Sequence, residues 1–342
     1  MKSTSIEDFN YDLPDELIAQ SPLKDRDQSK LLVYDKTLKT IKHTQFFNII
    51  NYLNTNDILV FNDTKVIKSR VFTKRNTGGK IEVFFLEKIN NQNWEVLLKK
   101  SHRLKINEVL TVDKDNQIKI IEKKDKTAIV SICSPIPDLD FLEKFGNTPL
   151  PPYIKNDRPN KYETNYQTVF ASKPGAVAAP TASLHFTNNL LAQLSTKKIE
   201  IIYITLHIGL GTFNPIQSKN IYDHKMHKEN YYISPESAKK SNTALKNKKR
   251  IIGVGTTVAR CLESNISNNE ISSGANTTNL YIKPGDKLKC ISGIITNFHL
   301  PKSSLLILIA SIVGVKEILN IYEEAINKQY RFFSFGDAML IT

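Results

Sequence analysis

The period of the hydrophobic pattern changes near residue 65 and again near residue 150. Between Val66 and Ile132 the chain runs through short stretches in which apolar and polar residues alternate, and polar turns such as Thr77–Gly79 separate these stretches. Regular short strands with polar turns are typical of a small β-barrel or sandwich. We therefore predict an all-β, barrel-like domain over residues 65–150.

Beyond a proline-rich stretch from Pro135 to Pro159, candidate strands alternate with candidate helices. Ile199–Leu206 is predicted as a strand and Pro235–Asn247 as a helix, whereas the polar stretch Asn265–Asn279 is predicted as a loop. Strands that alternate with helices indicate an α/β domain with a partly parallel sheet.

Residues 1–64 also contain strand-like runs, Lys30–Tyr34 and Asp57–Phe61. The predicted fold class is therefore α/β, with a discontinuous α/β domain made from residues 1–64 and 151–342 and an inserted small all-β domain. The apolar run Leu305–Val315 is shorter than the roughly 20 residues that a membrane-spanning helix needs. We expect it to form a core helix.

Basic residues exceed acidic ones, with 47 Lys and Arg against 34 Asp and Glu, a formal net charge of +13 and a pI of about 9.4. A basic surface attracts polyanions such as nucleic acid, although a host that favours Lys, Asn and Ile would give the same sum. If the partner is RNA, the candidate phosphate contacts are Lys65, Arg70, Lys74, Arg75, Lys80 and Lys173. Otherwise these side chains form an ordinary solvated surface.

The three cysteines, Cys133, Cys261 and Cys290, are far apart and form no CxxC pair. Neither a disulfide framework nor a thiolate metal site is expected. The first residues carry acidic side chains and no apolar core segment, unlike a signal peptide. We therefore expect a cytoplasmic protein with no membrane partner.

Two glycine-containing turns follow predicted strands. Gly253–Gly255 leads to Thr256 and Thr257, which are candidates to begin a helix, and Gly209–Gly211 has the same form. Glycine lets a ligand approach the backbone, and a helix N-terminus favours an anionic group. A tight β-to-α turn is the plainer explanation of each motif, because no third glycine completes a dinucleotide fingerprint. Two such turns favour a pocket at the C-terminal ends of the strands.

Five of the seven histidines lie in polar clusters at predicted strand ends: His185, His207, His224, His227 and His299. The spacing of His224 and His227, beside Asp223, could place both imidazoles on one helical face and form a metal site. However, the HExxH pattern is absent, and Lys225 and Lys228 would repel a cation. We expect no metal, and a metal-dependent hydrolase that uses His224 and His227 stays an alternative.

Near the C-terminus, Arg331 and Asp337 flank three phenylalanines, Phe332, Phe333 and Phe335. A strand that packs its aromatic side chains into the core is one explanation of this pattern. The other is an aromatic wall beside a charged pair, which could stack a base or face a cation such as a sulfonium.

These clusters, in this order, closely resemble the S-adenosylmethionine:tRNA ribosyltransferase-isomerase family of queuosine biosynthesis. The matching segments are residues 60–67, 77–83, 149–154, 166–170, 173–186, 206–213, 223–229, 253–264, 296–305 and 330–341. The departures are small: Ser183 stands where the family usually has glycine, and Val258-Ala259 replaces Ser-Val. Ordered matches of this number are far more specific than any single motif.

The resemblance implies that the enzyme transfers and isomerises the ribosyl part of S-adenosylmethionine onto 7-aminomethyl-7-deazaguanine at the wobble position of tRNAs with GUN anticodons. The product would be epoxyqueuosine, with adenine and methionine released. S-adenosylmethionine is then a substrate, no metal is implied, and the partner is tRNA through the anticodon stem-loop that carries the modified base. We expect a monomer. A noncatalytic tRNA-binding protein is the remaining alternative.

The implied chemistry needs a base for the C5′ proton beside the sulfonium and a proton donor for adenine. We assign Asp337 or Glu263 to the first task or to the sulfonium and His224 or His227 to the second, and Arg260 to the methionine carboxylate. The candidate catalytic residues are Asp223, His224, His227, Glu263, His299 and Asp337. The candidate S-adenosylmethionine contacts are Thr181, His185, His207, Gly209, Gly211, Thr212, Phe213, Gly255, Thr256, Thr257, Arg260, Thr296, Asn297, Phe298, Tyr330, Arg331 and Phe333.

Overall fold

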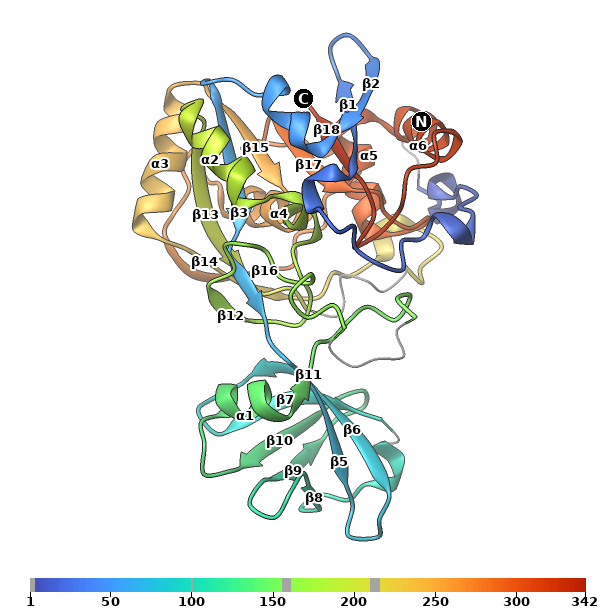
Figure 1. Cartoon of the computed structure of the whole chain (residues 1–342), viewed down its shortest axis with the longest axis vertical. Coiled ribbons are helices and arrows are strands. Elements are labelled where there is room, and N and C mark those ends of the chain that lie inside the picture. Colours follow the sequence, from blue (N-terminus) through green and yellow to red (C-terminus); the bar gives the residue numbers. More distant parts are fainter. Residues whose placement is uncertain (1–3, 100, 156–160, 210–215) are drawn as a thin grey trace.

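The computed structural model describes residues 4–99, 101–155, 161–209 and 216–342. It has a larger part and a smaller part stacked along the long axis of the molecule (Figure 1). Within the described residues, the larger part is built on a nine-stranded sheet and the smaller part on a seven-stranded sheet. The predicted fold class, an α/β fold with a barrel-like all-β section, is confirmed.

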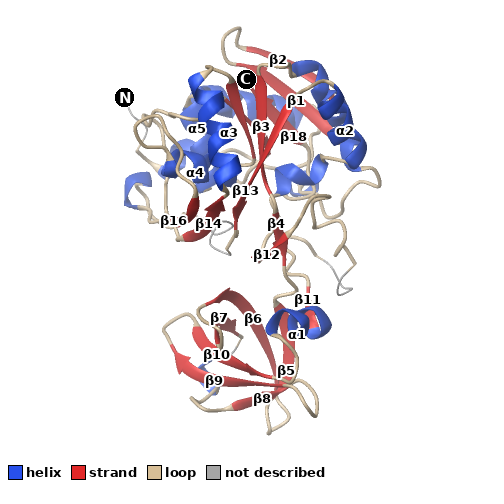
Figure 2. Cartoon of the chain, turned by 90° about the vertical axis from the view of Figure 1, so that its left-hand side faces the viewer, coloured by secondary structure: helices blue, strands red, loops and turns tan. Residues whose placement is uncertain are grey.

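The large sheet is mixed, and its strands lie in the order β16-β14-β13-β3-β15-β17-β18-β1-β2. Their bounds in that order are Gly274–Thr278, Glu229–Ile233, Glu200–Leu206, Asp57–Asn62, Arg250–Val254, Gly293–Asn297, Ala338–Ile341, Lys30–Asp35 and Thr40–Gln45. The four neighbours β13, β3, β15 and β17 run parallel. Their C-terminal ends therefore share one edge of the sheet, and this edge faces the smaller part (Figures 1 and 2).

Helices cover both faces of the large sheet (Figure 2). One face carries α3 (Pro235–Lys246), α4 (Thr256–Asn265), α5 (Ser304–Val313) and α6 (Val315–Asn327), and the other carries α2 (Asn188–Thr196) and the 3₁₀ helix η4 (Phe46–Tyr52). The remaining 3₁₀ helices are η1 (Ile6–Phe9), η2 (Asp15–Leu17), η3 (Arg26–Gln28), η5 (Ser101–Arg103), η6 (Thr181–His185) and η8 (Ile221–Asp223).

The apolar run near residue 305 forms helix α5, whose residues Leu306–Ala310 are buried. Gly314, with a φ of 98°, ends α5, and α6 follows at once, because glycine adopts this left-handed conformation without strain. In the described part of the chain, no single helix is long and apolar enough to cross a membrane, and α5 and α6 meet that criterion only as a pair bent by 111°.

The seven-stranded sheet of the smaller part has the order β11-β5-β6-β7-β10-β9-β8. The bounds in that order are Gly146–Asn147, Arg70–Lys74, Lys80–Lys88, Asn93–Leu98, Ala128–Cys133, Gln117–Lys123 and Val109–Thr111. Pairing of Lys74 with Thr111 joins β5 to β8 and closes the barrel. Phe141 and Leu142 of helix α1 (Asp138–Phe145) pack into the barrel core beside Trp94.

The chain enters the barrel through β4 (Thr64–Val66), which pairs in parallel with β12 (Lys173–Ala176) of the larger part. The two sheets and their separate apolar clusters support a division of the chain into two domains. We keep residues 65–150 as the proposed bounds of the inserted domain.

The predicted loop Asn265–Asn279 is wrong at its end, where Gly274–Thr278 forms the edge strand β16. This strand pairs antiparallel with β14, and its middle residues are exposed. Because Thr278 is its one buried residue, its polar sequence carries no alternating hydrophobic pattern.

Candidate active site

A pocket opens at the C-terminal ends of β15 and β17, where the N-termini of α4 and α5 also meet. Its empty volume, which includes space open to solvent, is about 950 Å³. Eight of the predicted S-adenosylmethionine contacts line it, together with the predicted catalytic residue His299: Thr181, Gly255, Thr256, Thr257, Thr296, Asn297, Phe298 and Phe333. The described residues that line this pocket include no Asp, Glu, Lys or Arg.

Helix α4 begins at the pocket with Gly255, whose φ of 98° a side chain would strain. This N-cap residue has no side chain that could accept hydrogen bonds from the first N–H groups of the helix. The buried hydroxyl of Thr257 also has no partner among the described residues. An uncapped helix N-terminus favours an anionic group, so this wall suits a carboxylate.

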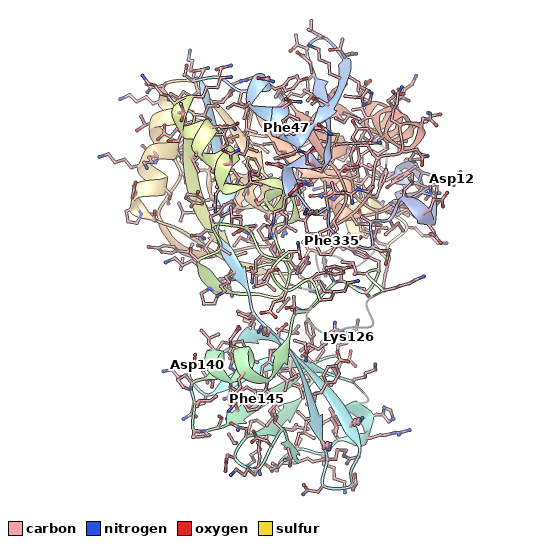
Figure 3. All side chains as sticks on the ribbon, viewed as in Figure 1. Asp12, Phe47, Lys126, Asp140, Phe145 and Phe335 are labelled. Atoms are coloured by element: carbon pink, nitrogen blue, oxygen red, sulfur yellow. The ribbon has the colours of Figure 1, made fainter. Side chains whose placement is uncertain are left out.

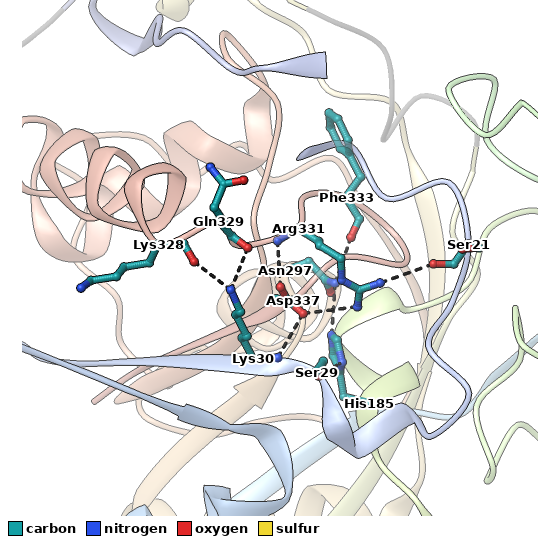
Figure 4. A network of polar contacts seen from close by, with 10 residues as sticks. All are labelled: Ser21, Ser29, Lys30, His185, Asn297, Lys328, Gln329, Arg331, Phe333 and Asp337. Carbon is teal, nitrogen blue, oxygen red and sulfur yellow. Dashed lines mark hydrogen bonds and ion pairs between the residues drawn. The ribbon is translucent and has the colours of Figure 1, made fainter. Parts of the chain in front are cut away.

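Asn297, at the end of β17, belongs to a buried polar network (Figure 4). Its Nδ2 donates to the carbonyl of Phe333 at 3.0 Å and lies 3.2 Å from His185 Nε2. His185 Nδ1 lies 2.8 Å from the hydroxyl of Ser29. Burial lowers the pKa of His185 to about 3, so its ring is neutral.

The Phe333 carbonyl can only accept a hydrogen bond, and this fixes the whole chain of donors. The amide nitrogen of Asn297 must face Phe333, its second N–H then faces His185 Nε2, and the ring proton of His185 sits on Nδ1 toward Ser29. The amide oxygen of Asn297 is left buried without a partner in the described part of the structure.

His299 lies in the same pocket wall and is also neutral, because burial lowers its pKa to about 3. Its Nε2 is 2.8 Å from the hydroxyl of Thr296. Two tyrosines fix its backbone: its N–H donates to Tyr322 at 2.9 Å, and its carbonyl accepts from the hydroxyl of Tyr11. His299 is the single histidine among the described lining residues.

Phe333 and Tyr153 form an aromatic wall of the pocket, with ring centroids 4.6 Å apart and planes 26° from parallel. Phe333 has a φ of 72°, an uncommon backbone conformation for a residue with a side chain. Such conformations cluster at functional sites. Tyr153 is absent from the predicted contacts, although the matching segment 149–154 contains it.

Asp337 does not line this pocket, and its side chain instead links two segments of the fold (Figure 4). Its buried carboxylate accepts from the backbone N–H of Lys30 at 3.0 Å, the backbone N–H of Arg331 at 2.8 Å and the Arg331 guanidinium at 3.3 Å. These bonds join β1 to the loop before β18. Arg331 points to a neighbouring small cavity that it shares with His185.

Glu263 and Arg260 also lie away from the pocket lining, although both belong to α4. The Glu263 carboxylate accepts from the backbone N–H groups of residues 289–291 at 2.7–2.9 Å. Arg260 is 2% exposed, pairs with Glu229 and donates to the carbonyl of Leu280 at 3.0 Å. The assignment of Arg260 to the methionine carboxylate stays a prediction: Glu229 balances its charge, and its Nη2 has no partner among the described residues.

Tyr330, another predicted contact, packs in the core against Phe298, with centroids 5.4 Å apart. Its hydroxyl lies 2.8 Å from His43 Nδ1. It supports the pocket wall from behind through Phe298.

A second cavity lies between the barrel and the large sheet, with an empty volume of about 1640 Å³ that includes solvent-open space. The larger part contributes Gly175, His207, Gly209, His227 and Glu229. The barrel contributes Glu87, Trp94, Glu95 and Lys126, and Figure 3 shows Lys126 at the junction of the two parts. Asn230 donates to Glu87 across this cleft.

His207 is held in the cleft by Thr64, whose hydroxyl lies 2.8 Å from its Nδ1. Burial lowers the pKa of His207. A Cβ at Gly175 would lie 2.8 Å from the His207 ring, so only glycine lets the two segments pack this closely. Gly209 donates its N–H to Glu229 at 3.2 Å.

Asp223, His224 and His227 do not converge on the β15–β17 pocket. Asp223 and His227 are exposed, and the ring of His224 packs edge-on against Tyr281 at 5.2 Å. Within the ranges that the structure describes, no three His, Cys, Asp or Glu side chains gather as metal ligands do. The predicted contacts Gly211, Thr212 and Phe213 lie outside the described residues.

The six predicted RNA contacts fall into two groups. Lys65 and Lys173 are exposed on the paired strands β4 and β12, beside the cleft. Lys74 and Lys80 are also exposed but pair at the β5–β6 turn, at the far end of the barrel (Figure 1). Arg70 pairs with Glu82 at 3.3 Å and Arg75 with Glu108 at 2.5 Å, so each has part of its charge neutralised.

Comparison with known proteins supports the resemblance read from the motifs. A family model described as "Queuosine biosynthesis protein" matches residues 6–341. Two relatives are named S-adenosylmethionine:tRNA ribosyltransferase-isomerase. The one from Staphylococcus haemolyticus is 47% identical over 343 residues, and the one from Desulforamulus reducens is 44% identical over 342 residues. Each comparison covers 98% of this chain and 99% of the relative.

Among solved structures, the chain is similar to the crystal structure of S-adenosylmethionine tRNA ribosyltransferase from Thermotoga maritima. The sequences are 31% identical, the TM-score is 0.57, and the match covers 98% of this chain and 100% of that one. The family prediction is confirmed, and with it the enzyme class and S-adenosylmethionine as the substrate. The chain belongs to the queuosine biosynthesis family, that of the S-adenosylmethionine:tRNA ribosyltransferase-isomerases.

Proposed function

We propose that this enzyme transfers and isomerises the ribosyl part of S-adenosylmethionine onto 7-aminomethyl-7-deazaguanine at the wobble position of tRNAs with GUN anticodons. The bonds from C5′ to sulfur and from C1′ to adenine break, and a bond forms to the amine of the base. Methionine leaves with the sulfur electron pair. C5′ and the amine each give up one proton, adenine takes up one proton, and one proton is released, while the ribosyl carbons rearrange into the epoxide-bearing ring of epoxyqueuosine.

The observation that carries this proposal is the pocket at β15 and β17. It combines an uncapped helix N-terminus, an aromatic wall and a buried neutral histidine at the C-terminal edge of a parallel sheet. A sulfonium substrate needs a site that takes its carboxylate, faces its cation and excludes water. We place the methionyl carboxylate at the N-terminus of α4 and the sulfonium near Phe298.

His299 is the proposed proton-transfer group of this pocket, because it is the titratable imidazole in the described lining. Its neutral ring has a lone pair that can accept a proton once the sulfonium has acidified the C5′ position. The earlier candidates Asp337 and Glu263 are already occupied by two and three backbone N–H groups respectively.

The tRNA is proposed to reach this pocket from the cleft between the barrel and the large sheet. Lys65 and Lys173 are the proposed phosphate contacts beside the cleft, and the modified base would leave its stack to enter the pocket. We further propose that the enzyme acts as a monomer, and that it works in the reducing cytoplasm, which its three scattered cysteines fit.

The test uses the full chain, labelled S-adenosylmethionine and an anticodon stem-loop that carries 7-aminomethyl-7-deazaguanine. The expected result is release of one adenine for each modified base. A matched stem-loop with guanine at the wobble position should release none. No release with the verified modified substrate, or equal release with guanine, would overturn the proposal.

A further inference from the structure

The amide oxygen of Asn297 takes part in none of the hydrogen bonds of the pocket wall. Asn297 is 2% exposed, and this oxygen has no partner among the described residues. An unpaired buried polar group costs about 1–3 kcal/mol. A ligand that donates a hydrogen bond to it would recover this cost.

The orientation of this amide is fixed before any ligand binds. Both N–H bonds of Asn297 are used, one by the Phe333 carbonyl and one by His185. A flipped amide would set its oxygen against the Phe333 carbonyl, and two acceptors repel. Asn297 belongs to the pocket wall, and its side chain can therefore accept a hydrogen bond from a ligand that reaches this oxygen, but it has no N–H left to donate.

The surroundings of Asn297 select the kind of donor. The described lining residues carry no carboxylate that could balance an ammonium group. The backbone carbonyl of Phe333 accepts from Asn297, and the ring of the same residue provides a flat apolar surface in the pocket wall. A neutral amine on a planar ring fits an acceptor placed beside an aromatic face.

We infer that Asn297 reads the exocyclic amine of the adenine in S-adenosylmethionine and so selects this substrate by its base. The inference rests on the proposed function, since it places the nucleoside in the β15–β17 pocket. His185 and Ser29 are positioning residues, because they act by holding the Asn297 amide.

The experiment compares S-adenosylmethionine with S-inosylmethionine, in which a carbonyl oxygen replaces the exocyclic amine. An acceptor would then face the Asn297 oxygen, and the cost of an unpaired buried group converts to about a 5- to 150-fold preference in kcat/KM for S-adenosylmethionine. In Asn297→Ala the activity falls, and the preference shrinks to within about 3-fold because the oxygen that discriminates is gone. Asn189→Ala, which removes an exposed amide on α2, should keep the full preference.

A wild-type enzyme that uses both substrates with equal kcat/KM would overturn the inference while leaving the proposed function intact. An undiminished preference in Asn297→Ala would also overturn it. If Asn297→Ala does not fold, binding of free adenine and hypoxanthine to the wild-type enzyme decides, and equal affinity counts against Asn297. Failure of the wild type to release adenine from S-adenosylmethionine would instead sink the proposed function.

Discussion

The pocket at β15 and β17 and the cleft beside the barrel share one edge of the large sheet, but apart from Ile208, which lines both, different side chains line them. The described lining of the pocket is uncharged, and its histidine is buried and neutral. The cleft is lined by acidic and basic side chains from both parts of the molecule, among them Glu87, Glu95, Lys126 and Lys228. An uncharged, preorganised wall suits bond breaking, whereas a cleft lined by charged side chains suits a large anionic partner.

The difference also explains why several predicted catalytic residues are not in the pocket. Charged side chains of α4 and of the C-terminal segment are used to hold the fold, as Glu263, Arg260 and Asp337 are. Neutral side chains of the same segments, such as Thr257 and Phe333, line the cavity. Five experiments test this division between residues that hold the fold and residues that line the pocket or the cleft.

The largest expected effect is on the chemical step. His299→Gln should lower the single-turnover rate of adenine release by about 10²–10⁴-fold, because the imidazole that transfers the proton is lost. The exposed His102 offers a matched control, and His102→Gln should react at the wild-type rate. A wild-type rate in His299→Gln would remove the proposed proton-transfer role.

The next test concerns the buried ion pair between Arg260 of helix α4 and Glu229 of the cleft. Glu229 and Arg260 have side chains 3% and 2% exposed. Glu229→Gln should lower the free energy of unfolding by about 3–5 kcal/mol, because it leaves a buried guanidinium without its counter-charge. Urea unfolding measures this loss.

Its control is the exposed pair Lys302–Glu7, with side chains 35% and 65% exposed. Glu7→Gln should change the free energy of unfolding by at most about 1 kcal/mol. If Glu229→Gln is as stable as the wild type but binds S-adenosylmethionine far more weakly, the guanidinium of Arg260 contacts substrate after all.

Asp337→Asn should lower the free energy of unfolding by about 1.5–3 kcal/mol, because charge-assisted bonds to Lys30 and Arg331 become weaker. The single-turnover rate of the folded enzyme should stay within a few-fold of wild type. Asp12→Asn, at an exposed carboxylate, should change neither quantity. A rate loss of about 10²-fold or more with unchanged stability would return Asp337 to the catalytic residues.

Buried neutral histidines predict how stability depends on pH. The pKa of His185 is lowered from 6.5 to about 3, so the unfolded chain binds the proton more tightly than the folded one. The stability that this residue contributes is complete above pH 6.5 and is lost as the pH falls from there toward 3. Between pH 7 and pH 5 the loss is about 2 kcal/mol for one such histidine.

His185→Gln should remove this loss, so urea unfolding of the variant should vary less between pH 7 and pH 5 than that of the wild type. The exposed His102 again gives the control, because its replacement should leave the pH dependence unchanged. Parallel pH curves for wild type and His185→Gln would show that His185 is not buried in its neutral form.

The smallest effect concerns the charged cleft. Lys65→Ala and Lys173→Ala should each lower the slope of log affinity for tRNA against log salt by about 1, as expected for one lost phosphate contact. Lys74→Ala and Lys80→Ala, at the far end of the barrel, should change the slope less. Equal changes at both places would mean that the tRNA lies along the whole barrel.

Much of the architecture could be predicted from the sequence, because hydrophobic periodicity depends on which faces are buried. The barrel strands, the parallel strands and the two helices around Gly314 all follow their patterns. The polar edge strand β16 shows no such pattern, since its middle residues are exposed. The order of the motifs also selected the family, and no single motif could have done so.

Tertiary structure decided which members of each motif face a cavity and which hold the fold. Thr257 and Glu263 lie on the same helix, six positions apart, yet one lines the pocket and the other binds backbone N–H groups. Residue type says that a carboxylate can act as a base, but its partners determine whether it is available. Those partners, such as residues 289–291 for Glu263 and Lys30 for Asp337, come from distant parts of the chain, so they become visible only when the fold brings them together.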